Sequence, residues 1–160
     1  MAIYLDLGQY DEVMEFYKKA QEVNPDAPES WYLFQHLGRL YYTTGRYEDA
    51  LTAFQEKCKI MRIDPIEDQH IGITYGFMGD RKKAEQVVKN LEKRKAFISI
   101  AYIYSALGDN NRAFEYMEKA YKNRTPENWN LVMLRADPEF KKIRSDPRYK
   151  ALLKKVGLPE

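Results

Sequence analysis

Stretches with apolar residues at helical spacing alternate along the chain with short polar breaks that contain glycine. Residues 31–42, WYLFQHLGRLYY, are followed by Gly45 and then by residues 47–60, YEDALTAFQEKCKI. Both stretches repeat their apolar positions with the period of an amphipathic helix. Glycine enters the left-handed conformation that ends many helices without steric strain. The pattern therefore predicts two helices joined by a turn at Gly45.

This two-helix unit recurs. The turn glycines are Gly8, Gly45, Gly79 and Gly108, and the intervals between them are 37, 34 and 29. Small residues of the two central units also match, since Ala84 follows Ala50 at the same interval as Gly79 follows Gly45. Self-similarity at such a period is typical of helical repeat arrays. We expect an all-α fold in which successive helix pairs stack into a solenoid.

The residues of the units resemble the tetratricopeptide repeat, a helix-turn-helix whose length matches the interval between Gly45 and Gly79. In the second unit the resemblance rests on Leu37, Gly38, Tyr41, Gly45, Ala50 and Phe54. It implies a right-handed superhelix of antiparallel helix pairs with about three and a half repeats. Their expected ranges are 1–25 for a partial repeat, then 29–64, 65–93 and 94–125. Lys57 departs from the family pattern, because a small residue is usual at its place.

The remaining residues, 126–160, are expected to form capping helices. Asp137-Pro138 and Asp146-Pro147 each combine an N-cap residue with proline in the first helical turn. Two short helices should follow, the second ending near Gly157. Apolar residues predicted to cover the end of the array are Leu134, Phe140, Ile143, Tyr149, Leu152, Leu153 and Val156. The segment resembles the ending of many bacterial and archaeal tetratricopeptide proteins.

Composition and charge narrow the class of protein. With 160 residues, 44% of them hydrophobic, the chain is long and apolar enough for one folded domain. Residues 1–80 carry 7 Lys and Arg against 14 Asp and Glu, whereas residues 81–160 carry 19 against 10. This asymmetry leaves three alternatives open, which are solvated helix faces, attraction of an acidic partner to the second half, and head-to-tail self-association. Cys58 is the single cysteine, which favours a reducing compartment and hence a cytoplasmic location.

Catalytic, metal-binding, nucleic-acid-binding and membrane functions are not predicted. His36 and His70 occupy equivalent positions of adjacent units, and no third His or second Cys completes a metal site. Phosphate-binding glycine loops and hydrolase motifs are absent, so we expect neither an enzyme nor a cofactor. The basic runs at 81–95 and 141–155 lack interleaved aromatics for base stacking. No apolar run approaches the length of a membrane span.

The family resemblance implies a concave groove that binds a partner peptide or protein. Applying the family's spacing to this chain gives candidate groove residues Tyr32, Gln35, His36, Arg39, Tyr42, Gln69, His70, Ile73, Phe77, Ile98 and Tyr102. Because Tyr and Arg carry much of the energy of interfaces, we expect the anchors for a peptide with apolar or aromatic side chains to be Arg39, Tyr42, Phe77 and Tyr102. The alternative is that these aromatics only fill the core between helices.

The predicted function is therefore a protein-interaction module. The alternative is a sensory or regulatory domain of a larger signalling protein, such as a kinase, cyclase or transcriptional regulator, that binds a small ligand or signalling peptide. Residues 1–25 begin inside a repeat, and a terminal repeat without a polar cap exposes apolar surface. Self-association through this partial repeat is a further prediction.

Overall fold

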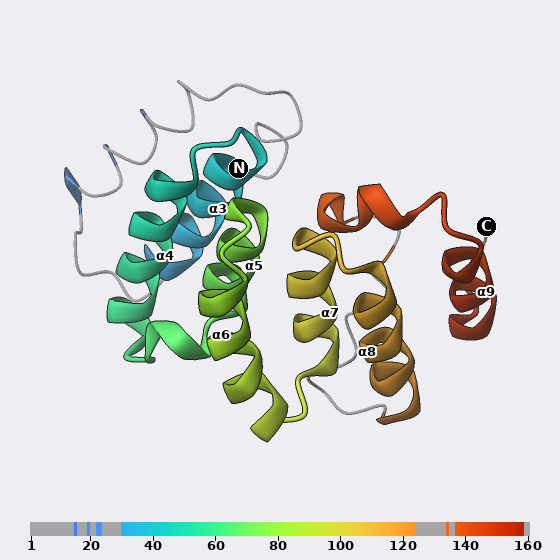
Figure 1. Ribbon diagram of the computed structural model, residues 1–160. Helices are drawn as coiled ribbons and strands as arrows, with labels where there is room; N and C mark the ends of the chain where they lie inside the picture. Colours follow the sequence, from blue (N-terminus) through green and yellow to red (C-terminus); the bar gives the residue numbers. More distant parts are fainter. Residues whose placement is uncertain are drawn as a thin grey trace.

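The computed structural model describes residues 15, 19, 22, 23, 30–123, 134 and 137–158 (Figure 1). Nearly all of the predicted partial repeat at 1–25, and with it the predicted self-association, lies outside the described residues. Within the described ranges every regular element is a helix and none is a strand.

The helices form consecutive pairs. The pairs are α3 (Ser30–Thr43) with α4 (Tyr47–Met61), α5 (Gln69–Met78) with α6 (Arg81–Lys93), and α7 (Phe97–Ala106) with α8 (Asn110–Asn123). A short 3-10 helix, η1 (Pro65–Glu67), joins the first pair to the second. The first helices of the pairs contact one another in order, with α5 lying between α3 and α7 (Figure 1). The predicted all-α solenoid of helix pairs is confirmed.

The turns within the pairs have the predicted glycine conformation. Gly45, Gly79 and Gly108 have φ values of 80°, 75° and 74°, in the left-handed region. At the end of α5, for example, the backbone N–H of Gly79 donates to carbonyls of the preceding helical turn. A side chain at these positions would strain the backbone, so the turn glycines set where the first helices end.

Two other glycines allow helices to approach closely. A Cβ atom added at Gly38 on α3 would overlap the ring of Phe54 on α4. A Cβ atom at Gly72 on α5 would overlap the side chain of Ile103 on α7. Both contacts belong to a densely packed core in which added volume displaces a neighbour. They fix how far α3 lies from α4 and how far α5 lies from α7.

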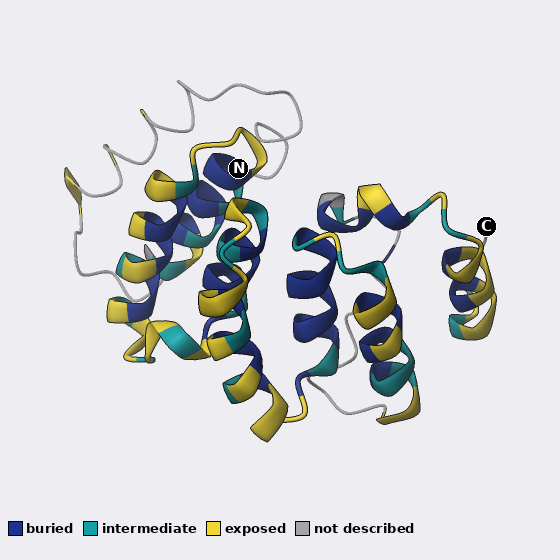
Figure 2. Ribbon diagram, viewed as in Figure 1, coloured by how far each residue is buried: buried dark blue, intermediate teal, exposed yellow. Residues whose placement is uncertain are grey.

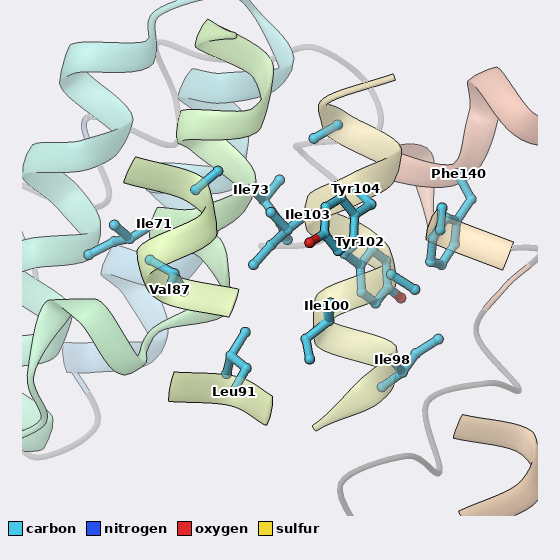
Figure 3. Close-up of a cluster of buried hydrophobic side chains, with 14 of the residues drawn as sticks. Ile71, Ile73, Val87, Leu91, Ile98, Ile100, Tyr102, Ile103, Tyr104 and Phe140 are labelled. Carbon is cyan, nitrogen blue, oxygen red and sulfur yellow. The ribbon is translucent and has the colours of Figure 1, made fainter. Parts of the chain in front are cut away.

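The core runs through the middle of the array and includes almost all of α7. Every residue from 98 to 106 is buried, whereas α6 buries only one face (Figure 2). This difference arises because α7 packs against α5 and α6 on one side and against α8 and the C-terminal segment on the other. Side chains of α5, α6 and α7 meet in a continuous apolar cluster that Phe140 extends (Figure 3).

The C-terminal segment contains a 3-10 helix, η3 (Pro138–Ile143), packed on α7, and an α-helix, α9 (Pro147–Val156), packed on α8. Helix α9 ends at Gly157 in the left-handed conformation, and the carboxylate of Asp146 accepts the N–H of Arg148 at its start. Of the apolar residues expected to cover the array, those buried are Leu134, Phe140, Ile143, Tyr149, Leu152 and Leu153.

The prediction for Asp137 is confirmed for its position but not for its hydrogen bonding. Asp137 occupies the N-cap position of η3, but its carboxylate accepts no hydrogen bond from the helix N–H groups. The carboxylate instead meets Arg39 of α3 and Tyr102 of α7. The charged and phenolic donors of the groove have replaced the local backbone donors that an N-cap usually binds.

Candidate peptide-binding groove

The first helices of the three pairs and the C-terminal segment surround one pocket of about 240 Å³. Its lining comes from α3, α5, α7 and the start of η3, and consists of Gln35, Arg39, Gln69, His70, Ile73, Tyr102, Asp137 and Glu139. Six of these eight residues belong to the groove predicted from sequence. The pocket is smaller than the roughly 300–1,000 Å³ of typical drug-sized ligand sites, and thus has room for a side chain rather than a large cofactor.

The other predicted groove residues lie around this pocket with different exposures. Tyr32 is half-exposed, and its ring lies 4.3 Å from that of His36, which is buried. Phe77 is partly buried between Tyr42 and Tyr47, with ring centroids 5.4 and 6.4 Å away. Tyr42 and Ile98 are 2% and 0% exposed. These two side chains therefore support the groove from below rather than line its open surface.

The donors of the groove converge on two acidic residues of the C-terminal segment. Nη2 of Arg39 lies 3.1 Å from a carboxylate oxygen of Glu139 and 3.5 Å from one of Asp137. The Tyr42 hydroxyl donates to Glu139, and the Tyr102 hydroxyl donates to Asp137. Each carboxylate thus receives the shared guanidinium and one phenol, a charge-assisted set that is stronger than neutral hydrogen bonds.

Contacts to the backbone and to an aromatic ring complete this docking. The Ser105 hydroxyl on α7 donates to the main-chain carbonyl of Glu139 at 3.0 Å. The ring of Phe140 stacks on that of Tyr102, with centroids 4.2 Å apart and planes inclined by 20° (Figure 3). The groove residues therefore contact the carboxylates, the main chain and the aromatic ring of residues 137–140.

Burial and charge determine the titration of this cluster. Burial raises the pKa of Tyr102 and of Tyr42, and the adjacent carboxylates raise both further, so the two phenols stay protonated as donors. Burial alone would lower the pKa of Arg39, but Tyr42 and the carboxylates outweigh it and raise that pKa. Burial raises the pKa of Asp137, the Tyr102 hydrogen bond opposes this shift, and the charge of Glu139 adds to it.

A second buried polar network surrounds His70, which lines the pocket. The ammonium of Lys57, only 3% exposed, pairs with the carboxylate of Asp68, and lies 3.3 Å from Nδ1 of His70. Asp68 also caps α5, accepting the backbone N–H of His70 at 2.9 Å. Burial lowers the pKa of His70, and the Lys57 charge lowers it further against the opposing hydrogen bond of Asp68. His70 is thus held as a neutral imidazole at the pocket wall.

The neighbouring Cys58 takes no part in the groove. Its thiol is 1% exposed, and burial together with the charge of Asp68 raises the pKa to about 11. Such a thiol stays protonated and behaves as a small core hydrophobe.

Sequence reasoning missed four residues of the site and its supporting network, which are Asp137, Glu139, Lys57 and Asp68. Asp137 and Glu139 were expected at the start of a capping helix, and the only signal for them was an acidic pair at the edge of a basic segment. Lys57 was noticed as a departure from the family pattern, without a partner. Its burial beside Asp68 explains the departure, because a cation replaces a small residue where a buried carboxylate needs one.

The described part of the chain shows neither a metal site nor a membrane-spanning helix. Among residues 30–123 and 137–158, no three His, Cys, Asp or Glu side chains come together as a metal site. None of the described helices has the length and apolar character to cross a membrane.

Comparisons with known proteins support the repeat architecture independently. Two family models described as tetratricopeptide repeat match the sequence, one over residues 4–56 and the other over residues 95–124. The chain contains tetratricopeptide repeats. The first match includes most of the predicted partial repeat at 1–25, whose structure is not described.

Two relatives share part of the sequence. The chain is 30% identical over 136 residues to the TPR repeat-containing protein MJ1428 of Methanocaldococcus jannaschii. The aligned region covers 81% of this chain and 23% of that protein. The chain is also 28% identical over 123 residues to protein O-mannosyl-transferase TMTC1 of Homo sapiens. That aligned region covers 74% of this chain and 14% of the human protein. The chain therefore spans less than a quarter of either relative. No solved structure matches it.

Proposed function

We propose that the chain is a protein-interaction module that binds a partner peptide in the groove formed by α3, α5 and α7. The observation that carries this proposal is the shared pocket, in which Gln35, Gln69 and Tyr102 come from the first helices of three successive pairs. Tetratricopeptide arrays are scaffolds for protein partners, and a groove lined by amide, aromatic and charged side chains suits a peptide.

A catalytic role is not part of the proposal. The similarity to the human O-mannosyl-transferase covers 14% of that protein, so the activity in its name is not transferred to this chain. No observation favours the alternative of a ligand-sensing regulatory domain. A cytoplasmic location, which the single cysteine favours, stays a prediction.

Selection from a displayed library of random dodecamer peptides on the full chain tests the proposal. Selected peptides are then titrated against the chain and against two variants of Gln35 and Lys89. We expect Gln35→Trp to weaken binding at least tenfold, because a bulky uncharged ring blocks the pocket beside Arg39. Lys89→Ala, on the exposed face of α6, is the matched control and should bind like the unmodified chain. Equal affinity for both variants would place binding outside the groove.

A further inference from the structure

We propose that the groove recognises a pair of acidic side chains followed by an aromatic ring, and that residues 137–140 of the same chain occupy it as a built-in ligand. This inference rests on the proposed function, because it assigns the chemistry of the partner to the same groove. A partner segment of this chemistry binds by displacing the built-in ligand.

The first argument is the match between donors and carboxylates. Arg39 faces both Asp137 and Glu139, and each carboxylate also receives one tyrosine hydroxyl. The donors lie on two different helix pairs and far from the acids in sequence, since the contact between Arg39 and Glu139 spans 100 residues. Such convergence of side chains from α3 and α7 is the arrangement expected of a site for an extended acidic segment.

The second argument is that the groove also contacts main chain and ring. Ser105 donates to the carbonyl of Glu139, which fixes the register of the docked backbone. Phe140 is fully buried and stacks on Tyr102, whose hydroxyl at the same time binds Asp137. One tyrosine thus reads both the acidic and the aromatic residue of the segment. Arg39, Tyr42 and Tyr102 are three of the four residues, with Phe77, that were expected from the family resemblance to anchor a peptide partner.

The third argument is that the segment is placed by the groove and not by its own helix. Asp137 precedes η3 in the N-cap position, yet its carboxylate binds groove side chains and leaves the helix N–H groups uncapped. Asp146, the equivalent residue of α9, does cap its helix. The difference indicates that contacts across the groove dominate the local preference at Asp137.

The fourth argument is that the built-in ligand leaves part of the site open. The pocket of about 240 Å³ beside Asp137 and Glu139 still reaches Gln35, Gln69 and His70. A partner segment has access to the groove at this point, and extends over surface that residues 137–140 do not use. A tethered ligand competes at an effective concentration on the order of millimolar, so partner binding to the unmodified chain is weak until the built-in ligand is displaced.

The test measures binding of a fluorescent peptide with the sequence of residues 134–143, LRADPEFKKI, to the full chain by fluorescence anisotropy. In a Glu139→Ala/Phe140→Ala variant, the built-in ligand lacks its most buried groups. We expect this variant to bind the peptide at least tenfold more tightly than the unmodified chain. Adding Arg39→Gln to the same variant should weaken binding at least tenfold.

Two controls separate recognition from loosened packing. Lys141→Ala/Lys142→Ala changes the two exposed residues that follow Phe140, and should bind the peptide no better than the unmodified chain. A control peptide, LRANPQAKKI, lacks the two charges and the ring, and should bind at least tenfold more weakly to the opened variant. Equal binding of both peptides would mean that exposed core surface is responsible, and would overturn the inference.

The outcomes also separate this inference from the function on which it rests. If the opened variant bound LRADPEFKKI no more tightly than the unmodified chain, or did so regardless of Arg39, residues 137–140 would be a structural cap only. If library-selected peptides were sensitive to Gln35→Trp but lacked acidic and aromatic residues, the groove would bind peptides of another chemistry. In that case the proposed function stands and the inference fails.

Discussion

Asp68 and Asp137 both occupy the N-cap position of a helix, and each carboxylate lies next to a cation, in a buried pair at Asp68 and a partly buried pair at Asp137. Burial alone would raise the pKa of Asp68, but the hydrogen bond from His70 and the charge and hydrogen bond of Lys57 outweigh it and lower that pKa. The pKa of Asp137 is raised, first by burial and then by the charge of Glu139. A neighbouring cation is therefore not enough, because burial and a nearby like charge can outweigh it and favour the protonated form.

This difference in pKa distinguishes Asp68, which anchors the fold, from Asp137, which makes an exchangeable contact. Asp68 receives two backbone N–H groups of α5 in addition to Lys57, and joins that helix to α4. Asp137 receives no helix N–H and shares one guanidinium with Glu139. We expect changes at Asp68 to affect the stability of the whole array, and changes at Asp137 to affect mainly the groove.

Asp68→Ala should produce the largest loss of stability. Removing one partner of a buried ion pair leaves Lys57 without compensation, which typically costs about 3–5 kcal/mol. Asp64→Ala is the control, because Asp64 caps η1 in an exposed position and its loss should cost only about 1 kcal/mol. Urea unfolding followed by circular dichroism measures both free energies. Similar losses for the two variants would contradict the special role of Asp68.

Replacing both members of the pair should be less damaging than removing Asp68 alone. Lys57→Met/Asp68→Asn leaves no unpaired charge, and Asn retains the side-chain oxygen that caps α5. We expect the double variant to lose less than about 2 kcal/mol of unfolding free energy. If it were as unstable as Asp68→Ala in the same urea titration, packing or cap geometry rather than charge would explain the loss.

The histidines should make stability depend on pH. Burial lowers the pKa of both His36 and His70 in the folded chain, so the unfolded chain binds protons more readily below about pH 6.5. The stabilisation is complete above that pH and decreases as the pH falls, by at most about 1.4 kcal/mol per pH unit for each histidine. Unfolding free energies between pH 7.5 and 5.0 should show this slope.

A His70→Asn variant provides the comparison for that measurement. It should lose the share of the slope that comes from His70 and keep the share from His36. The lowered pKa of Asp68 affects stability only below about pH 4, because stability from a depressed carboxyl is present above its unfolded value of about 3.9. An unchanged slope in the variant would show that His70 is not the titrating group.

Asp137→Asn should have the smallest effect on stability. Because the folded pKa of Asp137 is raised, its contribution is largest below about pH 3.9 and is lost as the pH rises through the folded value. Asn keeps an acceptor for Tyr102 and removes the repulsion with Glu139, so we expect a change within about 1 kcal/mol at pH 7. A loss comparable to that of Asp68→Ala would remove the distinction between the two acids.

The repeat architecture could be predicted because its requirements are local. The backbone is left-handed at Gly45 and Gly79, and Gly38 lies too close to Phe54 for a side chain. Each of these sites therefore requires glycine at a fixed position in the repeat. The groove spacing implied by the family resemblance also pointed to Arg39 and Tyr102, which lie at the pocket. The turn glycines and the close contact at Gly38 follow from helix geometry and its period.

The occupant of the groove could not be predicted in the same way. The Asp-Pro pair at 137 and 138 is a strong local signal for an N-cap, and the donors that compete with it lie far away in sequence. Arg39 and Asp137 are 98 residues apart. Only the folded array brings them together, as it brings Lys57 to Asp68. Long-range electrostatics overrode a local preference at Asp137, while at Asp68 both acted in the same direction.

The rate at which the buried Cys58 reacts measures how often this array opens. Its thiol lies on α4 one residue after Lys57, protonated and shielded from solvent. A thiol-specific reagent can modify it only when α4 separates from its neighbours and the thiol meets water. Because Cys58 is the single cysteine of this chain, the rate of modification measures the separation of α4 alone. The residue with no role in binding thus reports how often the ion pair beside it comes apart.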